Sequence, residues 1–169
     1  ENQGGDRCTN TGNMSGFVGL GGIVSFNAGG IFNCRLSGNF GNPILDCIGG
    51  IAGLNGRADN AVWHTYTDVK NKKWEYTSGL VAGCSTQAGR NVLGHSYVGG
   101  IVGYNMSGAQ LRDNESCANV SGSGDYVGGI VGVNAGNIWI SEDKSTASRT
   151  VTGALGIGGL AGWNKAGGI

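Results

Sequence analysis

The chain has 169 residues, of which 36 are Gly and one is Pro, and its 11 basic residues balance its 11 acidic ones. Collagen is excluded because it needs Gly at every third position and abundant Pro. Disorder is disfavoured because the apolar residues, 39% of the chain, cluster at fixed places. Without a basic field or an apolar run of about 18 residues, we expect neither nucleic-acid binding nor membrane insertion.

A seven-residue pattern organises the whole chain. It is clearest as G-G-I-V-G-Y-N over residues 99–105, and a degraded copy lies at 78–84. The copies begin at residues 21, 49, 78, 99, 128 and 158, with spacings of 28, 29, 21, 29 and 30 residues. Periods of 20 to 50 residues are typical of solenoids, propellers and repeat arrays. We therefore predict a single repeat domain over 1–169.

In chain order, residues 1–20 belong to a preceding coil, and each heptad then opens a coil of its own. Coil two contains a β-rich segment at 61–69, a polar turn at 70–73 and a returning segment at 74–77, which together predict a hairpin. The six predicted coils are 21–48, 49–77, 78–98, 99–127, 128–157 and 158–169. Because coil six stops shortly after its heptad, we interpret the chain as a fragment of a longer repeat array.

The predicted fold is all-β, a β-solenoid resembling a parallel β-helix. No stretch has the 3.6-residue apolar period of an amphipathic helix, and each Gly in a helix interior costs about 1 kcal/mol. Equivalent residues of a solenoid stack at about 4.8 Å. The third heptad position thus predicts an aliphatic ladder of Ile23, Ile51, Leu80, Ile101, Ile130 and Leu160. The seventh predicts an amide ladder of Asn27, Asn55, Asn105, Asn134 and Asn164.

Two aspects of the heptad stay open at the level of sequence. The Gly pair at its start permits either a positive φ at a sharp corner or a backbone approach too close for a Cβ atom. Alternation along a strand places positions three, five and seven on one face and positions four and six on the other, but a bend at the Gly pair would break this parity. The sequence therefore does not indicate which heptad face is buried.

The pattern V-G-G-I-V-G-Y-N, followed by an Asn-Cys or Ser-Cys segment and then V-S-G, resembles the GLUG motif repeat, most clearly over residues 98–134. This family occurs in large secreted or surface-anchored bacterial proteins, including filamentous-haemagglutinin-like adhesins and the non-catalytic regions of immunoglobulin A proteases. The resemblance implies an extracellular stalk or adhesive segment whose partner is a host or cell-surface protein or glycan. It implies no catalytic residue, since the HExxH motif of those proteases is absent.

The cysteines predict no metal site. Five are present, without a CxxC pair or a Cys/His cluster, so we expect no zinc and no other cofactor. Cys8 and Cys34 precede Gly-containing turns, which suggests a disulfide between adjacent coils. The alternative is that these thiols are buried and stack like small hydrophobic side chains.

The predicted hairpin concentrates aromatic residues. They form a candidate contact surface for a protein or glycan, because aromatic rings supply rigid contact area. Its members are Trp63, His64, Tyr66, Trp74 and Tyr76. The alternative is that half of them belong to the core and the rest to an ordinary strand face.

Three alternative functions remain beside the stalk. A polysaccharide-processing β-helix needs converging carboxylates, whereas the acidic residues here do not repeat at equivalent positions, so we expect no enzyme. An ice-binding solenoid needs Thr-x-Thr at one register, and the three such pairs shift register: Thr9/Thr11, Thr65/Thr67 and Thr150/Thr152. A filament is the third, since open solenoid ends expose unpaired strand edges on which another copy can stack.

Overall fold

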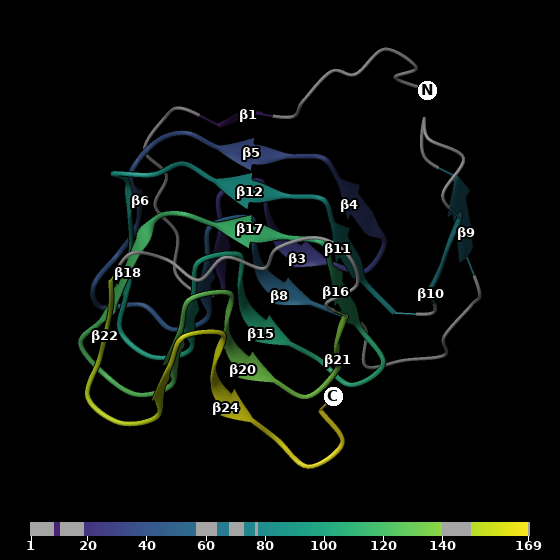
Figure 1. Cartoon of the computed structure of the whole chain (residues 1–169). Coiled ribbons are helices and arrows are strands. Elements are labelled where there is room, and N and C mark those ends of the chain that lie inside the picture. Colours follow the sequence, from purple (N-terminus) through teal and green to yellow (C-terminus); the bar gives the residue numbers. More distant parts are fainter. Residues whose placement is uncertain are drawn as a thin grey trace.

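The computed structural model is a β-solenoid of about four turns, in which every described strand outside one hairpin lies in a parallel sheet (Figure 1). The structure describes residues 9–10, 19–56, 64–67, 73–76, 78–139 and 150–168. The stacked parallel sheets confirm the predicted fold class, an all-β solenoid. In the described part of the chain, no helix has the length and hydrophobicity needed to cross a membrane.

The heptads build two five-stranded parallel sheets. The residue before each of these heptads and the heptad's first Gly form one sheet, of β2 (Leu20–Gly21), β7 (Ile48–Gly49), β14 (Val98–Gly99), β19 (Val127–Gly128) and β23 (Ile157–Gly158). The last four heptad residues form the second sheet, the asparagine sheet, of β3 (Val24–Asn27), β8 (Ala52–Asn55), β15 (Val102–Asn105), β20 (Val131–Asn134) and β24 (Ala161–Asn164).

Three four-stranded parallel sheets complete each turn. The first contains β4 (Gly30–Phe32), β11 (Leu80–Ala82), β16 (Gln110–Arg112) and β21 (Asn137–Trp139). The second contains β1 (Thr9–Asn10), β5 (Arg35–Leu36), β12 (Ser85–Thr86) and β17 (Glu115–Ser116). The third contains β6 (Phe40–Gly41), β13 (Asn91–Gly94), β18 (Asn119–Gly122) and β22 (Val151–Thr152). One full turn thus runs from β14 through β18.

Close backbone packing explains the heptad glycines. A Cβ atom on Gly99 would overlap the carbonyl oxygen of Val102, and one on Gly103 would lie 2.5 Å from the carbonyl carbon of Cys47. Neither glycine has a positive φ. These glycines are therefore explained by close backbone packing and not by a positive φ. The neighbouring backbone lies so near that no side chain fits.

The burial pattern answers the question of which heptad positions face inward. Ile101, Val102 and Asn105 are fully buried, whereas Tyr104 is only half-buried. Both Ile101 and Val102 belong to the hydrophobic core. Consecutive residues can share the inside because the chain bends between them, so simple alternation fails at this point.

The prediction of six coils is wrong, because the segment beginning at residue 78 does not open a coil. β8 pairs directly with β15, so no strand of the asparagine sheet comes from residues 78–98. β11 pairs instead with β4 and β16, which follow the heptads in their own turns. The hairpin of β9 (His64–Thr67) and β10 (Lys73–Tyr76) is inserted into the second turn and lengthens it.

Leu80 is accordingly not a member of the aliphatic ladder. It pairs with Gly30 and Gln110, and it is buried in a small cluster separate from the main core. That cluster contains Tyr76 of the hairpin and is flanked by Phe32. The local sequence Ser-Gly-Leu-Val-Ala-Gly resembles the heptad, but its strand partners place it in a different sheet.

Candidate functional site

The five heptad asparagines form one continuous chain of side-chain hydrogen bonds through the solenoid. Each Nδ2 donates to the Oδ1 of the asparagine in the following turn, over 2.7 Å from Asn27 to Asn55, 2.8 Å from Asn55 to Asn105, 2.8 Å from Asn105 to Asn134 and 2.7 Å from Asn134 to Asn164. Asn55, Asn105 and Asn134 are fully buried. Paired in this way, the buried amides avoid the cost of unsatisfied polar groups.

The aliphatic residues at the third heptad position stack beside this chain of amides. The backbone N–H of Ile23 donates to Ile51 O, that of Ile51 to Ile101 O, that of Ile101 to Ile130 O and that of Ile130 to Leu160 O, all over 2.8–2.9 Å. The side chains of the three middle residues are buried in the main core. Both ladders are thus structural features of the solenoid interior.

The predicted aromatic contact surface is only partly described. Trp63 lies outside the described residues, as do the side chains of His64, Tyr66 and Trp74. Tyr76 is buried, and its ring meets that of Phe32 edge to face at 6.4 Å. Burial also raises the pKa of Tyr76. Tyr76 therefore anchors the hairpin to the solenoid and is not exposed to a partner.

Cys47 and Cys84 are free thiols. Cys34 and Cys84 are buried in neighbouring turns, where the backbone N–H of Cys34 donates to Cys84 Sγ over 3.4 Å. Cys8 lies outside the described residues, so its disulfide with Cys34 stays a prediction. Burial, with a smaller effect of the neighbouring Asp46 charge, raises the pKa of Cys47 to about 11. A thiol with this pKa is a poor nucleophile at neutral pH.

A column of aromatic rings on the outside of the solenoid was not predicted. Tyr97 and Tyr126 stack in parallel at 5.7 Å, and Tyr126 stacks on Trp163 at 4.9 Å. Tyr104 meets Tyr97 edge to face at 6.4 Å. Lys165 Nζ lies 4.9 Å from the Trp163 ring and 3.1 Å from the Tyr104 hydroxyl. We call Tyr97, Tyr104, Tyr126 and Trp163 the aromatic column.

Two members of the aromatic column have an unusual backbone conformation. Tyr97 and Tyr126 have φ of 57° and 61°, a left-handed conformation that is uncommon for bulky residues. Gly19 and Gly156 have the same conformation at the equivalent positions of other turns. Non-Gly residues held in such a conformation cluster at functional sites. A tyrosine two residues before a heptad was the available sequence signal, but the ring stacking depends on the three-dimensional register.

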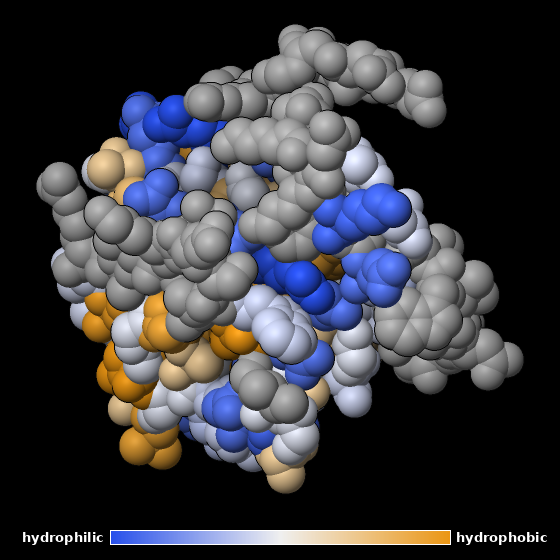
Figure 2. Space-filling view, turned by 45° about the vertical axis from the view of Figure 1, so that its right-hand side comes forward, coloured by the Kyte–Doolittle hydropathy of each residue, from blue (hydrophilic) through white to orange (hydrophobic). Residues whose placement is uncertain are grey.

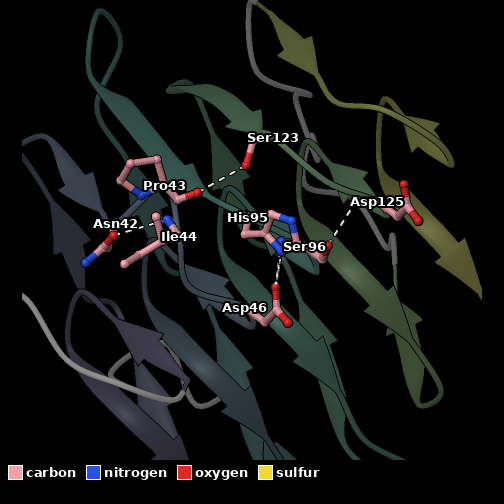
Figure 3. A network of polar contacts seen from close by, with 8 residues as sticks. All are labelled: Asn42, Pro43, Ile44, Asp46, His95, Ser96, Ser123 and Asp125. Carbon is pink, nitrogen blue, oxygen red and sulfur yellow. Dashed lines mark hydrogen bonds and ion pairs between the residues drawn. The ribbon is translucent and has the colours of Figure 1, made fainter.

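A polar corner lies next to the aromatic column in the sequence. Its members come from neighbouring turns and are Asp46, His95, Ser96 and Asp125 (Figure 3). Asp46 Oδ1 lies 2.9 Å from His95 Nδ1 and accepts the backbone N–H of Ser96 over 2.9 Å. Ser96 Oγ lies 3.3 Å from the same His95 nitrogen and accepts the backbone N–H of Asp125 over 3.1 Å. About half of each side chain of the His95–Asp46 pair is exposed.

The polar corner lacks the geometry of a catalytic triad. A triad needs the acid on one imidazole nitrogen and the nucleophile on the other. Here the Asp46 carboxylate and the Ser96 hydroxyl both approach Nδ1 of His95. The contacts of the polar corner therefore tie neighbouring turns together and leave polar groups at the surface, where they can contact a partner.

The described residues hold no group of three or more His, Cys, Asp or Glu side chains that could bind a metal ion. Thr9, Thr65 and Thr152 lie in three different sheets, so the threonine pairs do not form the single flat array that ice binding requires.

Comparison with protein-family models, with curated proteins and with solved structures gave no match. The aromatic column and the polar corner are thus the candidate site that the structure offers.

Proposed function

We propose that this chain is a structural and adhesive segment of a secreted or cell-surface bacterial protein, with no chemistry of its own. The observation that carries the proposal is the unbroken register of the sheets, in which buried amides and aliphatic side chains repeat from turn to turn. Such a stack resists bending because successive turns pair with one another in five parallel sheets. The resemblance to GLUG repeats supports the extracellular location.

The aromatic column and the polar corner supply the adhesive part of the proposal. Aromatic rings and nearby hydrogen-bonding groups are the combination that buried contact surfaces use. Glycan binding is a second candidate, favoured by the parallel stack of Tyr97 and Tyr126 with an exposed Trp163 at its end. Both proposals use the same face, so one experiment tests them together.

The chain would be displayed on a bacterium that does not adhere by itself, and adhesion to epithelial cells and to a glycan array would be counted. We expect the displayed chain to increase adhesion and the double variant Tyr97→Ser, Tyr126→Ser to abolish the increase. The matched control is Trp139→Ser, which removes an exposed ring from a different sheet. Adhesion that is equal with and without display, or turnover of a polysaccharide on the array, would contradict the proposal.

A further inference from the structure

The polar corner has an opening where one residue lacks a side chain. The N–H of Gly124 donates to His95 O over 2.8 Å, so the two residues lie side by side in neighbouring turns. A Cβ atom on Gly124 would lie 2.3 Å from Ser96 Oγ and 3.0 Å from His95 Nε2. Gly124 has no positive φ, so its backbone conformation does not require glycine. The missing side chain therefore leaves room beside the Ser96 hydroxyl and the His95 ring.

The bonds within the polar corner determine which groups around this opening donate and which accept. The Asp46 carboxylate only accepts, so the neutral His95 ring carries its proton on Nδ1, 2.9 Å from Asp46 Oδ1, and Nε2 is an acceptor. Ser96 Oγ accepts the N–H of Asp125, which leaves the Ser96 hydroxyl proton to donate. The Asp125 carboxylate points away from His95 and Ser96 (Figure 3). The opening thus offers acceptors and a donor together.

Half-buried tyrosine rings adjoin these polar groups. Tyr97 directly follows Ser96, Tyr126 directly follows Asp125, and the two rings stack in parallel at 5.7 Å. Both tyrosines have a left-handed backbone conformation, and in two other turns a glycine occupies this place. Because glycine adopts this conformation without strain, the two tyrosines indicate that the rings themselves have a role at the surface.

Apolar surface also adjoins the polar corner. Ile44 is 78% exposed, and its loop is held against the corner by the Ser123 hydroxyl, which donates to Pro43 O over 3.1 Å (Figure 3). Figure 2 shows hydrophobic side chains beside hydrophilic ones at the lower left of the solenoid. Apolar and aromatic surface with a few placed polar groups is typical of ligand sites.

We propose that the polar corner and the two tyrosines that adjoin it bind a neutral glycan, with a sugar hydroxyl seated in the opening at Gly124. This inference rests on the proposed adhesive function and names the ligand of its candidate site. A sugar hydroxyl both donates and accepts, so it can donate to His95 Nε2 or Asp125 and accept from Ser96. The tyrosine rings then pack against the C–H groups of the sugar.

Charge and hydrogen bonding narrow the class of ligand. The carboxylates of Asp46 and Asp125 would repel a sialylated or sulfated glycan. Lys165 does not offset them, because its Nζ is bound to the Tyr104 hydroxyl over 3.1 Å within the aromatic column. A basic peptide would match the carboxylates, but its ammonium and guanidinium groups only donate, so the Ser96 hydroxyl would lack an acceptor.

A glycan array tests the ligand class. It carries neutral oligosaccharides together with their sialylated and sulfated counterparts, with a hexa-arginine peptide spotted beside them, and it is probed with the purified chain at low ionic strength. We expect neutral members to be bound, and their charged counterparts to be bound at least about 5-fold more weakly because of the two carboxylates. Hexa-arginine should not be bound.

Two variants test the opening. Gly124→Ala fills it and should weaken the binding of neutral glycans at least about 10-fold, because a sugar hydroxyl no longer reaches its partners. Ser96→Ala removes the donor without adding volume and should weaken binding as well. The matched control is Gly29→Ala, where a Cβ atom meets nothing within 4 Å. Circular dichroism shows that each variant is folded.

A third variant tests the discrimination by charge. Asp125→Asn keeps the shape of the side chain and removes one charge, so it should reduce the difference between neutral and charged glycans to about 2-fold. The control is Glu115→Gln, which removes an exposed carboxylate from β17 and should leave the difference unchanged.

Failure of this inference is distinguishable from failure of the proposed function. If bacteria that display the chain adhere to epithelial cells while no neutral glycan is bound, the adhesive role stands and the inference is overturned. Binding of neutral glycans without adhesion would support the site and contradict the adhesive role. Equal or tighter binding of charged glycans, binding of hexa-arginine that Asp125→Asn abolishes, or neutral binding that survives both Gly124→Ala and Ser96→Ala would also overturn the inference.

Discussion

At the scale of single residues, the solenoid depends on two residue types. Buried asparagines bond to one another, and glycines lie where no space remains for a Cβ atom. Asn105 is buried between two other amides and can be satisfied only by them and by nearby backbone. Gly100 lies where the backbone of the next turn and the Ser116 side chain leave no space for a Cβ atom. Substitution at such positions reports directly on the stacking.

Asn105→Ala is expected to lower the free energy of unfolding by about 2–4 kcal/mol, because it removes the partner of Asn55 Nδ2 and of Asn134 Oδ1 inside the protein. Asn164→Ala is the control, since the same substitution at the exposed end should cost less than about 1 kcal/mol. Urea denaturation measures both. Equal losses at the two positions would show that burial of the ladder is unimportant.

Gly100→Ala is expected to cost about 3 kcal/mol or more, because the added methyl group would overlap the Gly129 carbonyl oxygen, which the sheet holds in place. Gly29→Ala is the matched control. A Cβ atom there meets nothing within 4 Å and the residue has no positive φ, so stability should change by less than about 1 kcal/mol. Thermal unfolding measures the difference, and a tolerated Gly100→Ala would disprove the close packing.

At the scale of elements, the hairpin of β9 and β10 is an insertion into the second turn and not part of the stack. Gly56 lies directly beside the segment to which the chain returns, since a Cβ atom on Gly79 would be 2.5 Å from Gly56 N. In the following turn a single residue, Ser107, connects the equivalent positions Met106 and Gly108. The solenoid path is therefore complete without the hairpin.

Replacing residues 57–77 by one Ser is expected to leave a folded solenoid. The free energy of unfolding should fall by about 1–3 kcal/mol, chiefly because Tyr76 no longer covers Leu80 and Phe32. Tyr76→Ala in the whole chain should cause a loss of similar size. Circular dichroism and urea denaturation measure both, and an unfolded product would show that the solenoid needs the inserted segment.

At the scale of the whole molecule, the turns do not share the same protection. Among the described strands, those of the middle turns pair on both sides, whereas β24 pairs only with β20. In a stack of repeats, stability is a sum of each repeat and its interfaces with neighbours, so the last turn should open first.

Hydrogen exchange followed by mass spectrometry tests this order. The amides of Ile101 and Ile130 should exchange at least about 100-fold more slowly than those of Leu160 and Ala161. The former donate to the following turn, whereas no described strand follows β24 in its sheet. A β24 as protected as β15 would contradict the uneven stability.

The sequence alone determined the fold class and most members of both ladders. The heptad carries the information locally, because its glycines, one aliphatic residue and one Asn define the shape of a turn wherever they occur. The coil count failed at residues 78–84, since the local pattern does not say which strand becomes the neighbour. Leu80 was misplaced for the same reason.

Only the tertiary structure decided which residues of different turns meet at the surface. The stacking of Tyr97, Tyr126 and Trp163 and the contact of Asp46 with His95 join residues 29 to 49 positions apart. The number of residues between such partners depends on where the hairpin is inserted and on the length of the chain at each corner. A repeated motif thus specifies the shape of one turn, whereas the alignment of successive turns depends on hydrogen bonding and packing between them.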